Sequence, residues 1–367
     1  MQKDIGALTP DQVQALVGDE PEREIEEVGA PSTEPDPPQK MHLGSLRPIR
    51  LELIEGKLGL NFPIYTREES DGDVSLLVPK GSRLSPRLRQ RIEAKHKGMV
   101  YIQAKDYAAY ADETERTIER ILSDESKGIQ EKTPIFFSYA TERLNDAFQR
   151  IAEEGGENVK LVQPVAEHAL GLVQEDWRAA FSILKLAKAE PHTYAHSLNV
   201  CFFGLSFIHN YLPHYTDKEL KEIALGFLGH DIGELLVSEK TLNKKMGLNP
   251  LERSVIQQVP IYGTRVLKEA GVDYPLTVDI VLNHHERVDG KGYPRGLPGH
   301  KIPVLARICT VCEAFDTMTT PQPYRKNTLT PFEAFRVMLH EKPGQFDLPV
   351  LTSFIRMMGG NPRREPD

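Results

Sequence analysis

The sequence predicts a mainly α-helical protein in which an acidic leader and a small α+β module precede a large all-helical domain. Residues 1–45, the leader, are rich in acidic side chains and proline. Residues 46–105 alternate short apolar runs with turn residues, which is typical of strands. From residue 106 onwards apolar residues recur every three or four positions, the spacing of helices that bury one face. The length of 367 residues suggests two or three domains.

The negative charge is concentrated in the leader. Residues 1–40 contain ten Asp or Glu and three Lys or Arg, whereas the whole chain carries a net charge of −8. Few aliphatic residues could anchor this segment, so we expect it to be disordered, either as a solvated leader or as a tail that binds a protein partner. Because the rest of the chain is close to neutral, no basic face for DNA is expected.

The cysteines and the apolar runs indicate a cytoplasmic protein. There are three cysteines, Cys201, Cys309 and Cys312, which is too few for a disulfide framework and favours a reducing compartment. Cys309 and Cys312 share an apolar run without a turn, so we interpret them as small buried groups of one helix face. The N-terminus lacks a basic segment followed by an apolar one, so no signal peptide is expected. The longest apolar run, 200–208, is too short to span a membrane.

The small module should contain four strands and one helix. Turn residues separate or follow the apolar runs, and Ser85 followed by Pro86 is typical of a helix start. The module shows no cluster of His, Cys or acidic residues, so we expect docking or regulation from it rather than chemistry. The predicted strands lie within 47–54, 60–68, 73–79 and 98–106, and the predicted helix covers 85–96.

The helical part begins with a predicted helical linker over 106–130 and continues as one domain over 131–360, followed by a tail over 361–367. Its first helical stretches are separated by Gly155, Gly156 and Asp176, and no strand pattern interrupts them. These stretches are 114–125, 136–154, 159–173 and 177–189.

Residues that bind metals are concentrated in the second half of the chain. His192 and His196 are four apart, hence on one helix face, and His230 is followed by Asp231 after an apolar helix. A buried imidazole beside a carboxylate is costly unless the two pair or bind a cation. A second pair of imidazoles then enters a glycine-rich loop, and glycines let backbone amides approach an anion. The later members of the set are His284, His285, the loop 289–296, and Glu313 and Asp316 on an apolar helix.

Each motif alone also has a structural interpretation. The His230–Asp231 pair could be an ion pair at a helix end, and His284–His285 could be a solvated helix end before a tight turn. Cys309 and Cys312 are not candidate ligands, because we interpret them as small buried groups of one helix face. Taken together, imidazoles and carboxylates beside an anion-binding loop favour a metal site next to a phosphate site.

In order and approximate spacing, these motifs resemble the HD-GYP family. The resemblance covers roughly residues 130–360 and is most specific in 284–297, which read HHERVDGKGYPRGL. His196–Ser197, PYR at 323–325 and FD at 346–347 also fit. The resemblance implies an all-helical, metal-dependent phosphohydrolase of bacterial signalling that hydrolyses cyclic di-GMP with two or three divalent ions, usually iron or manganese, of which two are expected here.

The resemblance also implies roles for individual residues. The metal ligands carried over are His196, His230, Asp231, His284, His285 and Glu313, with Asp231 bridging the ions. His230, Asp231 and Glu234 form the candidate catalytic set. Cyclic di-GMP would contact the loop residues Asp289, Gly290, Gly292, Tyr293 and Pro294, and its phosphate would meet Arg325.

Several positions depart from the family pattern. A ligand histidine is replaced by Val259, which cannot bind a metal, although Glu252, Pro260 and Gly263 around it align. Glu234 replaces a lysine that faces the phosphate, which reverses a charge beside an anionic substrate.

Further departures are milder. Glu313 stands where the family has aspartate, and Gln322 replaces an arginine. His192 occupies a position where some members carry a glutamate associated with a third metal. It favours a two-metal centre or is a surface residue.

We therefore expect an HD-GYP protein of cyclic di-GMP signalling with an impaired active centre and two metal ions or fewer. Glu234 could supply an oxygen where Val259 withdraws a nitrogen. The alternative is a non-catalytic receptor that binds the dinucleotide or a partner protein through the intact loop. A protein partner for the leader or module and a homodimer are left open by the sequence.

Overall fold

The computed structural model describes residues 46–56, 59–67, 74–96, 99–189, 194–242, 244, 247–321, 328–342 and 344–360. The leader and the tail lie outside these residues, and so do His192, Gln322 and Arg325. The predictions made for them are therefore not addressed by the fold.

The small module is a four-stranded antiparallel sheet with one helix, as predicted. The strand order is β1-β4-β2-β3, and α2 is followed by the return strand β4. The hydroxyl of Ser85 accepts a hydrogen bond from the Leu88 amide at 3.2 Å, which confirms the predicted helix start. The strands are β1 (Leu46–Arg50), β2 (Ile64–Arg67), β3 (Val74–Val78) and β4 (Met99–Gln103), and the helix is α2 (Pro86–His96).

The first predicted strand is shorter than expected. It ends at Arg50, and Leu51–Leu53 form a single turn of 3-10 helix, η2. Leu51 and Leu53 are both buried although they are two residues apart, because Leu51 enters the core of the module and Leu53 enters the core of the helical domain. Buried residues two positions apart are therefore found both in a strand and in a turn that packs against two cores, and the sequence does not distinguish the two.

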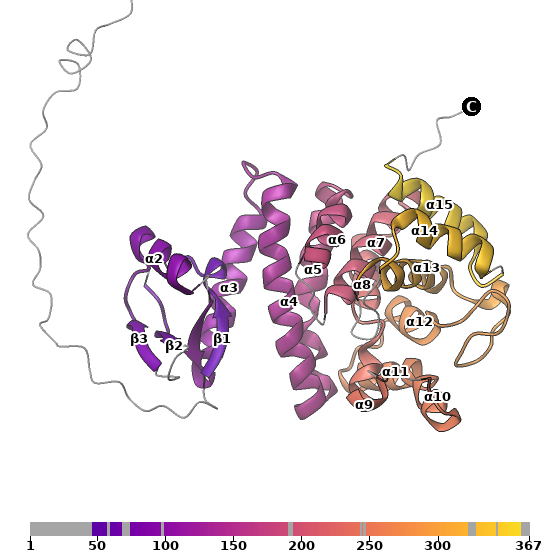
Figure 1. The fold of residues 1–367 in the computed structure, drawn as a ribbon, viewed down its shortest axis with the longest axis horizontal. Helices are drawn as coiled ribbons and strands as arrows, with labels where there is room; N and C mark the ends of the chain where they lie inside the picture. The colour runs from indigo at the N-terminus through magenta and orange to yellow at the C-terminus, as the bar shows by residue number, and fades with distance from the viewer. Residues whose placement is uncertain are drawn as a thin grey trace, which may run out of the picture.

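Helix α3 (Tyr107–Leu122) belongs to both cores and follows the short turn η3 (Ala104–Asp106). Tyr107 and Tyr110, in its first turn, pack with the sheet, whereas Ile118 packs with the helices. The segment predicted as a helical linker over 106–130 therefore contains the whole of a packed helix. Figure 1 shows the sheet on one side of α3 and the helical domain on the other.

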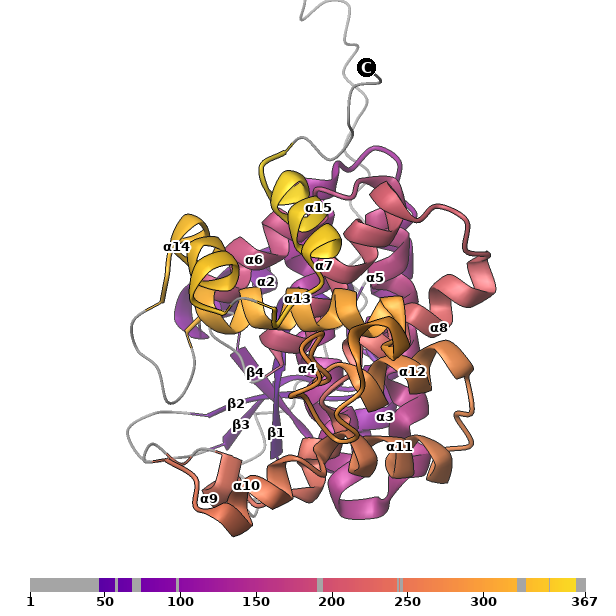
Figure 2. The same cartoon turned by 90° about the vertical axis from the view of Figure 1, so that its right-hand side faces the viewer.

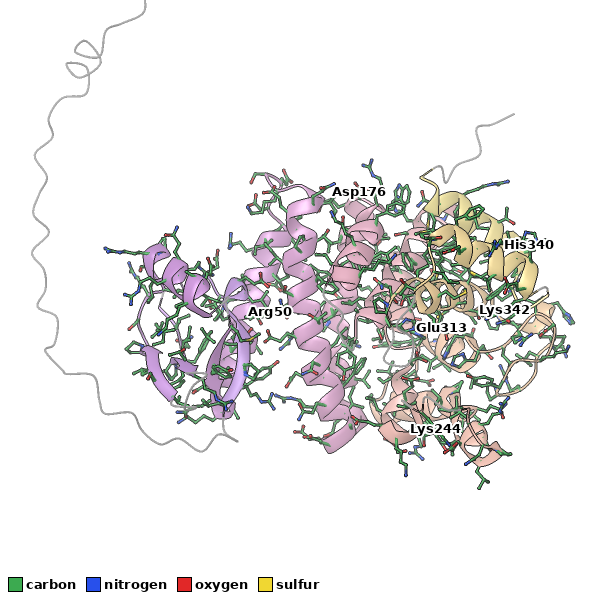
Figure 3. All side chains as sticks on the ribbon, viewed as in Figure 1. Arg50, Asp176, Lys244, Glu313, His340 and Lys342 are labelled. Carbon is green, nitrogen blue, oxygen red and sulfur yellow. The ribbon has the colours of Figure 1, made fainter. Side chains whose placement is uncertain are left out.

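Polar contacts join the module to α4 (Ile129–Glu154), in addition to the apolar packing of Leu53. Arg47 of β1 donates to Asp146 at 2.7 Å, and its guanidinium lies 4.6 Å from the centroid of the Tyr107 ring. Arg50 donates to the hydroxyl of Ser138 at 3.4 Å, and Figure 3 labels it between the sheet and α4. Ser138 and Asp146 are eight residues apart on one face of α4, so this face docks the module through charge and hydrogen bonds.

The remaining helices form one continuous core, as the all-helical prediction required. Figure 2 shows α13 crossing the domain, with α14 and α15 on one side of it and α11 and α12 on the other. No helix among the described residues is long and apolar enough to cross a membrane. These elements are η4 (Gly156–Leu161), α5 (Gln163–Glu175), α6 (Ala179–Ala189), α7 (Ala195–Tyr211), α8 (Asp217–Leu228), η5 (Ile232–Leu236), α9 (Glu239–Leu242), α10 (Pro250–Ile256), α11 (Val259–Glu269), α12 (Pro275–Asn283), η6 (Gly299–Lys301), α13 (Val304–Thr319), α14 (Pro331–Arg336), the π-helical turn η7 (Val337–Glu341) and α15 (Leu348–Met358).

Helix α7 is the centre of the domain. All residues from Ser197 to Ile208 are buried, which is expected of a helix that is apolar on every side. Helices α8 and α13 pack against it. Cys201, Cys309 and Cys312 are buried and free, in agreement with their interpretation as small core groups.

Candidate metal centre

Four imidazoles from three helices meet around one carboxylate, that of Asp231. The Nε2 atoms of His230 and His284 lie 3.1 and 3.3 Å from its oxygens. Those of His196 and His285 lie 3.8 and 3.9 Å away. The structure therefore brings together four histidines that the sequence placed in separate motifs.

Backbone carbonyls at the ends of two helices orient two of these imidazoles. His230 follows the end of α8 and His284 is the C-cap of α12. The Nδ1 atom of His230 lies 2.9 Å from the carbonyl oxygen of Phe227, and that of His284 lies 3.0 Å from the carbonyl oxygen of Val281. The last carbonyls of a helix lack backbone partners, so they accept these N–H groups. In both rings the lone pair is then on Nε2, which faces Asp231.

The central atoms have no hydrogen-bond partner. Within the described residues, the Nε2 atoms of His230 and His284 and the Oδ1 atom of Asp231 are buried without one. Orphaned buried polar atoms are costly, at about 1–3 kcal/mol each, and in native proteins they call for an explanation. A cation between these donors removes the cost.

The donors form two groups that share one residue. His196, His230 and Asp231 offer ligand atoms within 4.8 Å of one another, and so do Asp231, His284 and His285. Imidazole nitrogens with a carboxylate oxygen suit divalent iron, manganese or zinc. The residues present therefore fit two divalent ions that share Asp231.

Two further carboxylates border the imidazoles. Glu313, on α13, places an oxygen 3.6 Å from Nδ1 of His285, and Figure 3 labels it among the helices of the C-terminal half. Burial, with the negative charge of Asp231 as the second cause, raises the pKa of Glu234 to about 8. The negative charge of Asp231 and burial away from water thus both oppose ionisation of Glu234, and a cation nearby would favour its charged form.

Asp316 is the residue whose role the sequence did not reveal. Its carboxylate is fully buried, and it accepts hydrogen bonds from Nδ1 of His196 and from the amide of Asn199, both at 2.6 Å. Although burial opposes protonation, this hydrogen bond raises the pKa of His196 to about 9. The available signal was spacing, since Asp316 lies one turn after Glu313 and Asn199 lies three residues after His196.

The glycine-rich loop is organised by one buried carboxylate, Glu286. Its two oxygens accept the backbone amides of Arg295 and Leu297, each at 2.8 Å. A side chain at Gly292 would place its Cβ 2.3 Å from the Arg287 nitrogen, so only glycine fits there. The loop is therefore held in one shape directly after His285.

The loop brings Tyr293 to the metal centre. The centroid of its ring lies 4.6 Å from that of His285, and its peptide bond to Pro294 is cis. Asp289 pairs with Arg287 at 2.6 Å inside the loop, and Gly290 adopts a positive φ of 73°. Among the predicted ligand-binding residues, Tyr293 thus lies against a candidate metal ligand, whereas Asp289, Gly290 and Gly292 shape the loop.

Val259 lies where the predicted pattern has lost a ligand. It is buried at the start of α11. A Cβ on Gly233 would come within 2.0 Å of the Val259 carbonyl oxygen, so position 259 sits against the turn that carries Asp231 and Glu234. The valine side chain adds no donor atom to this side of the centre.

Comparisons with known proteins agree with this geometry. Residues 213–350 match the model of the HD domain family. The chain is 36% identical over 182 residues to a cyclic di-GMP phosphodiesterase of Pseudomonas aeruginosa, which covers 49% of this chain and 43% of that protein. It is 35% identical over 129 residues to a cyclic di-GMP phosphodiesterase of Thermotoga maritima, covering 35% of each.

One further relative is named for a different substrate, and one similar protein has a solved structure. A 3'3'-cGAMP-specific phosphodiesterase of Vibrio cholerae is 34% identical over 137 residues, covering 37% of this chain and 31% of that protein. A solved structure of an HDG"Y"P protein from Bdellovibrio bacteriovorus superposes with a TM-score of 0.62 at 17% identity, over 86% of this chain and 100% of that one. The latter similarity concerns the fold alone.

The matched family and the histidine–aspartate centre define an HD domain, a class that binds divalent metals. The relatives matched by this part of the chain support its resemblance to HD-GYP domain proteins. The alignments cover less than half the length of these curated relatives.

Proposed function

We propose that this protein acts in cyclic di-GMP signalling, binding the dinucleotide beside a two-metal centre whose hydrolytic activity is impaired. The observation that carries the proposal is the pair of ligand groups that share Asp231. A phosphodiester is anionic and resists attack by neutral water. Two divalent ions, iron or manganese in this proposal, would activate the water and neutralise the phosphate when bound.

The side chains have distinct tasks in this proposal. His196 and His230 would hold one ion with Asp231, and His284 and His285 would hold the other with Asp231. The ring orientations of His196, His230 and His284, which Asp316 and helix-end carbonyls fix, support the assignment.

The neighbouring groups complete the pocket. Glu313 supplies a further oxygen beside His285. The loop from Asp289 to Pro294 borders the dinucleotide, with Tyr293 beside the metal ligands. Arg325 contacts phosphate in this proposal on the ground of the family resemblance alone.

Val259 and Glu234 are the reason to propose impairment. The valine removes a nitrogen ligand, and the glutamate puts a carboxylate where a cation would attract phosphate. Both lie on the same side of the centre, so Glu234 could restore an oxygen ligand. Measuring iron and manganese in Glu234→Gln tests this, since unchanged metal content would contradict the compensation.

The second candidate function is a receptor without turnover. Val259 favours it, because losing one ligand weakens catalysis more than it weakens ligand binding beside an intact loop. The partner could then be a protein that contacts the leader or the module, and a homodimer is compatible with either function. The three free cysteines support the cytoplasm as the proposed location.

The deciding experiment combines metal analysis and turnover on one sample. Protein purified without oxygen is assayed for iron and manganese, for binding of cyclic di-GMP and 3'3'-cGAMP, and for hydrolysis of both. Bound metal with cyclic di-GMP binding and slow turnover is the expected result. Binding without turnover would establish the receptor, whereas no binding of either dinucleotide would overturn both functions. His230→Asn serves as the metal-deficient control.

A further inference from the structure

The two groups of candidate ligands differ in how their imidazoles are held. We infer that the two metal positions are unequal: the position of His196, His230 and Asp231 binds its ion more tightly than the position that includes His284 and His285, and Asp316 is the positioning residue responsible. This inference rests on the proposed function, because it presupposes that the site takes divalent ions.

The carboxylate of Asp316 has a buried and fully partnered environment. One oxygen, Oδ2, lies 2.6 Å from Nδ1 of His196 and accepts the hydroxyl of Thr320 at 3.0 Å. The other oxygen accepts the Asn199 amide at 2.6 Å. Asn199 and Thr320 are neutral, and His196 is the partner that can carry positive charge. A buried carboxylate is strongly destabilised without such a partner.

This arrangement favours a cation on the far side of the imidazole. The hydrogen bond to Nδ1 fixes the ring of His196 so that Nε2 faces Asp231, at 3.8 Å. A carboxylate behind a ligating histidine also raises the basicity of the ligand, and removing such a partner typically costs 10–100-fold in metal affinity. An ion at Nε2 therefore provides the buried Asp316 with positive charge through the ring.

In the second position, none of the described residues gives His284 or His285 a carboxylate as a hydrogen-bond partner. His284 is oriented by neutral backbone carbonyls. The Nδ1 atom of His285 lies 3.6 Å from Glu313, which is too long for a hydrogen bond. Because no hydrogen bond from the described part of the chain fixes the ring of His285, an ion at this position must order that side chain when it binds, which lowers its affinity.

A purely structural role of Asp316 makes a different prediction. If the carboxylate only tied α13 to α7, its replacement would lower the stability of the fold and leave the relative affinities of the two ions unchanged. The two roles are therefore separated by a metal titration with a stability measurement on the same variants.

The test is a titration of chelator-treated protein with Mn²⁺, followed by the electron paramagnetic resonance signal of the free ion. Wild-type protein should bind one equivalent at least about tenfold more tightly than the second. Asp316→Asn should weaken the tight equivalent by about 10–100-fold. His285→Gln should lose the weak equivalent and keep the tight one. Asp146→Asn is the matched control, since Asp146 is a buried carboxylate that pairs with Arg47.

The outcomes separate the inference from the function on which it rests. Two equal affinities in the wild type, an unchanged tight site in Asp316→Asn, or loss of the tight site in His285→Gln would overturn the asymmetry. Wild-type protein that binds no divalent ion would overturn the proposed metal centre itself. If Asp316→Asn fails to fold by circular dichroism, the wild type and His285→Gln still decide whether the two positions are unequal.

Discussion

Replacing Glu286 with alanine is expected to destabilise the loop beside the metal centre by several kcal/mol. The buried carboxylate accepts two backbone amides, those of Arg295 and Leu297, at 2.8 Å each. Hydrogen bonds to a charged group contribute about 1.5–3 kcal/mol each, so losing both costs about 3–6 kcal/mol locally. Because about 1.4 kcal/mol corresponds to a factor of ten, hydrogen–deuterium exchange of these two amides should accelerate by at least about two orders of magnitude.

Glu286→Gln keeps one acceptor oxygen but presents an NH₂ group to the other amide, so about half the effect is expected. Glu154→Gln, at the exposed end of α4, controls for the loss of one negative charge. If the Arg295 and Leu297 amides of Glu286→Ala exchange as in the wild type, Glu286 does not organise the loop and the argument is wrong.

Three further predictions concern metal, pH and packing. Addition of Mn²⁺ at a hundredfold excess over its Kd should stabilise the fold by about 2.7 kcal/mol and raise the Tm, with EDTA reversing the shift; a Tm insensitive to both would count against the centre. Burial raises the pKa of Glu142, on α4, from 4.5 to about 7. The folded state then holds a proton that the unfolded state has released, so unfolding free energy should fall as pH rises from about 4.5 to about 7, and Glu142→Gln should lack this fall. Parallel pH profiles would refute that assignment. Gly292→Ala should abolish dinucleotide binding while leaving Mn²⁺ binding measurable, because its Cβ would lie 2.3 Å from the Arg287 nitrogen; unchanged dinucleotide affinity in a binding assay would contradict this.

Local patterns in the sequence determined most of the elements. Apolar periodicity and turn residues located the four strands, and Ser85 with Pro86 marked the start of α2. The pattern failed at Leu51–Leu53, where alternation reflects contacts with two cores and not a strand. Such patterns report which side of an element is buried, since that depends on spacing along the chain.

The metal-type residues were also identifiable in sequence, because their chemical types and spacing are unusual in an apolar context. Their motifs predicted that His196, His230, Asp231, His284 and His285 act together, and the fold brings these five around one point. The roles of the residues as ligands remain predictions.

Only the tertiary structure decided how those residues are supported. Asp316 meets His196 across 120 positions of sequence, and Arg47 meets Asp146 across 99. Glu286 looks like a solvated charge in sequence, yet it is buried and holds two amides. These contacts depend on which helix faces pack together and on how a loop folds back, and residue spacing along the chain does not encode either. The sequence thus determined which side chains could bind metal, and the packing of α7, α12 and α13 decided how each of them is oriented.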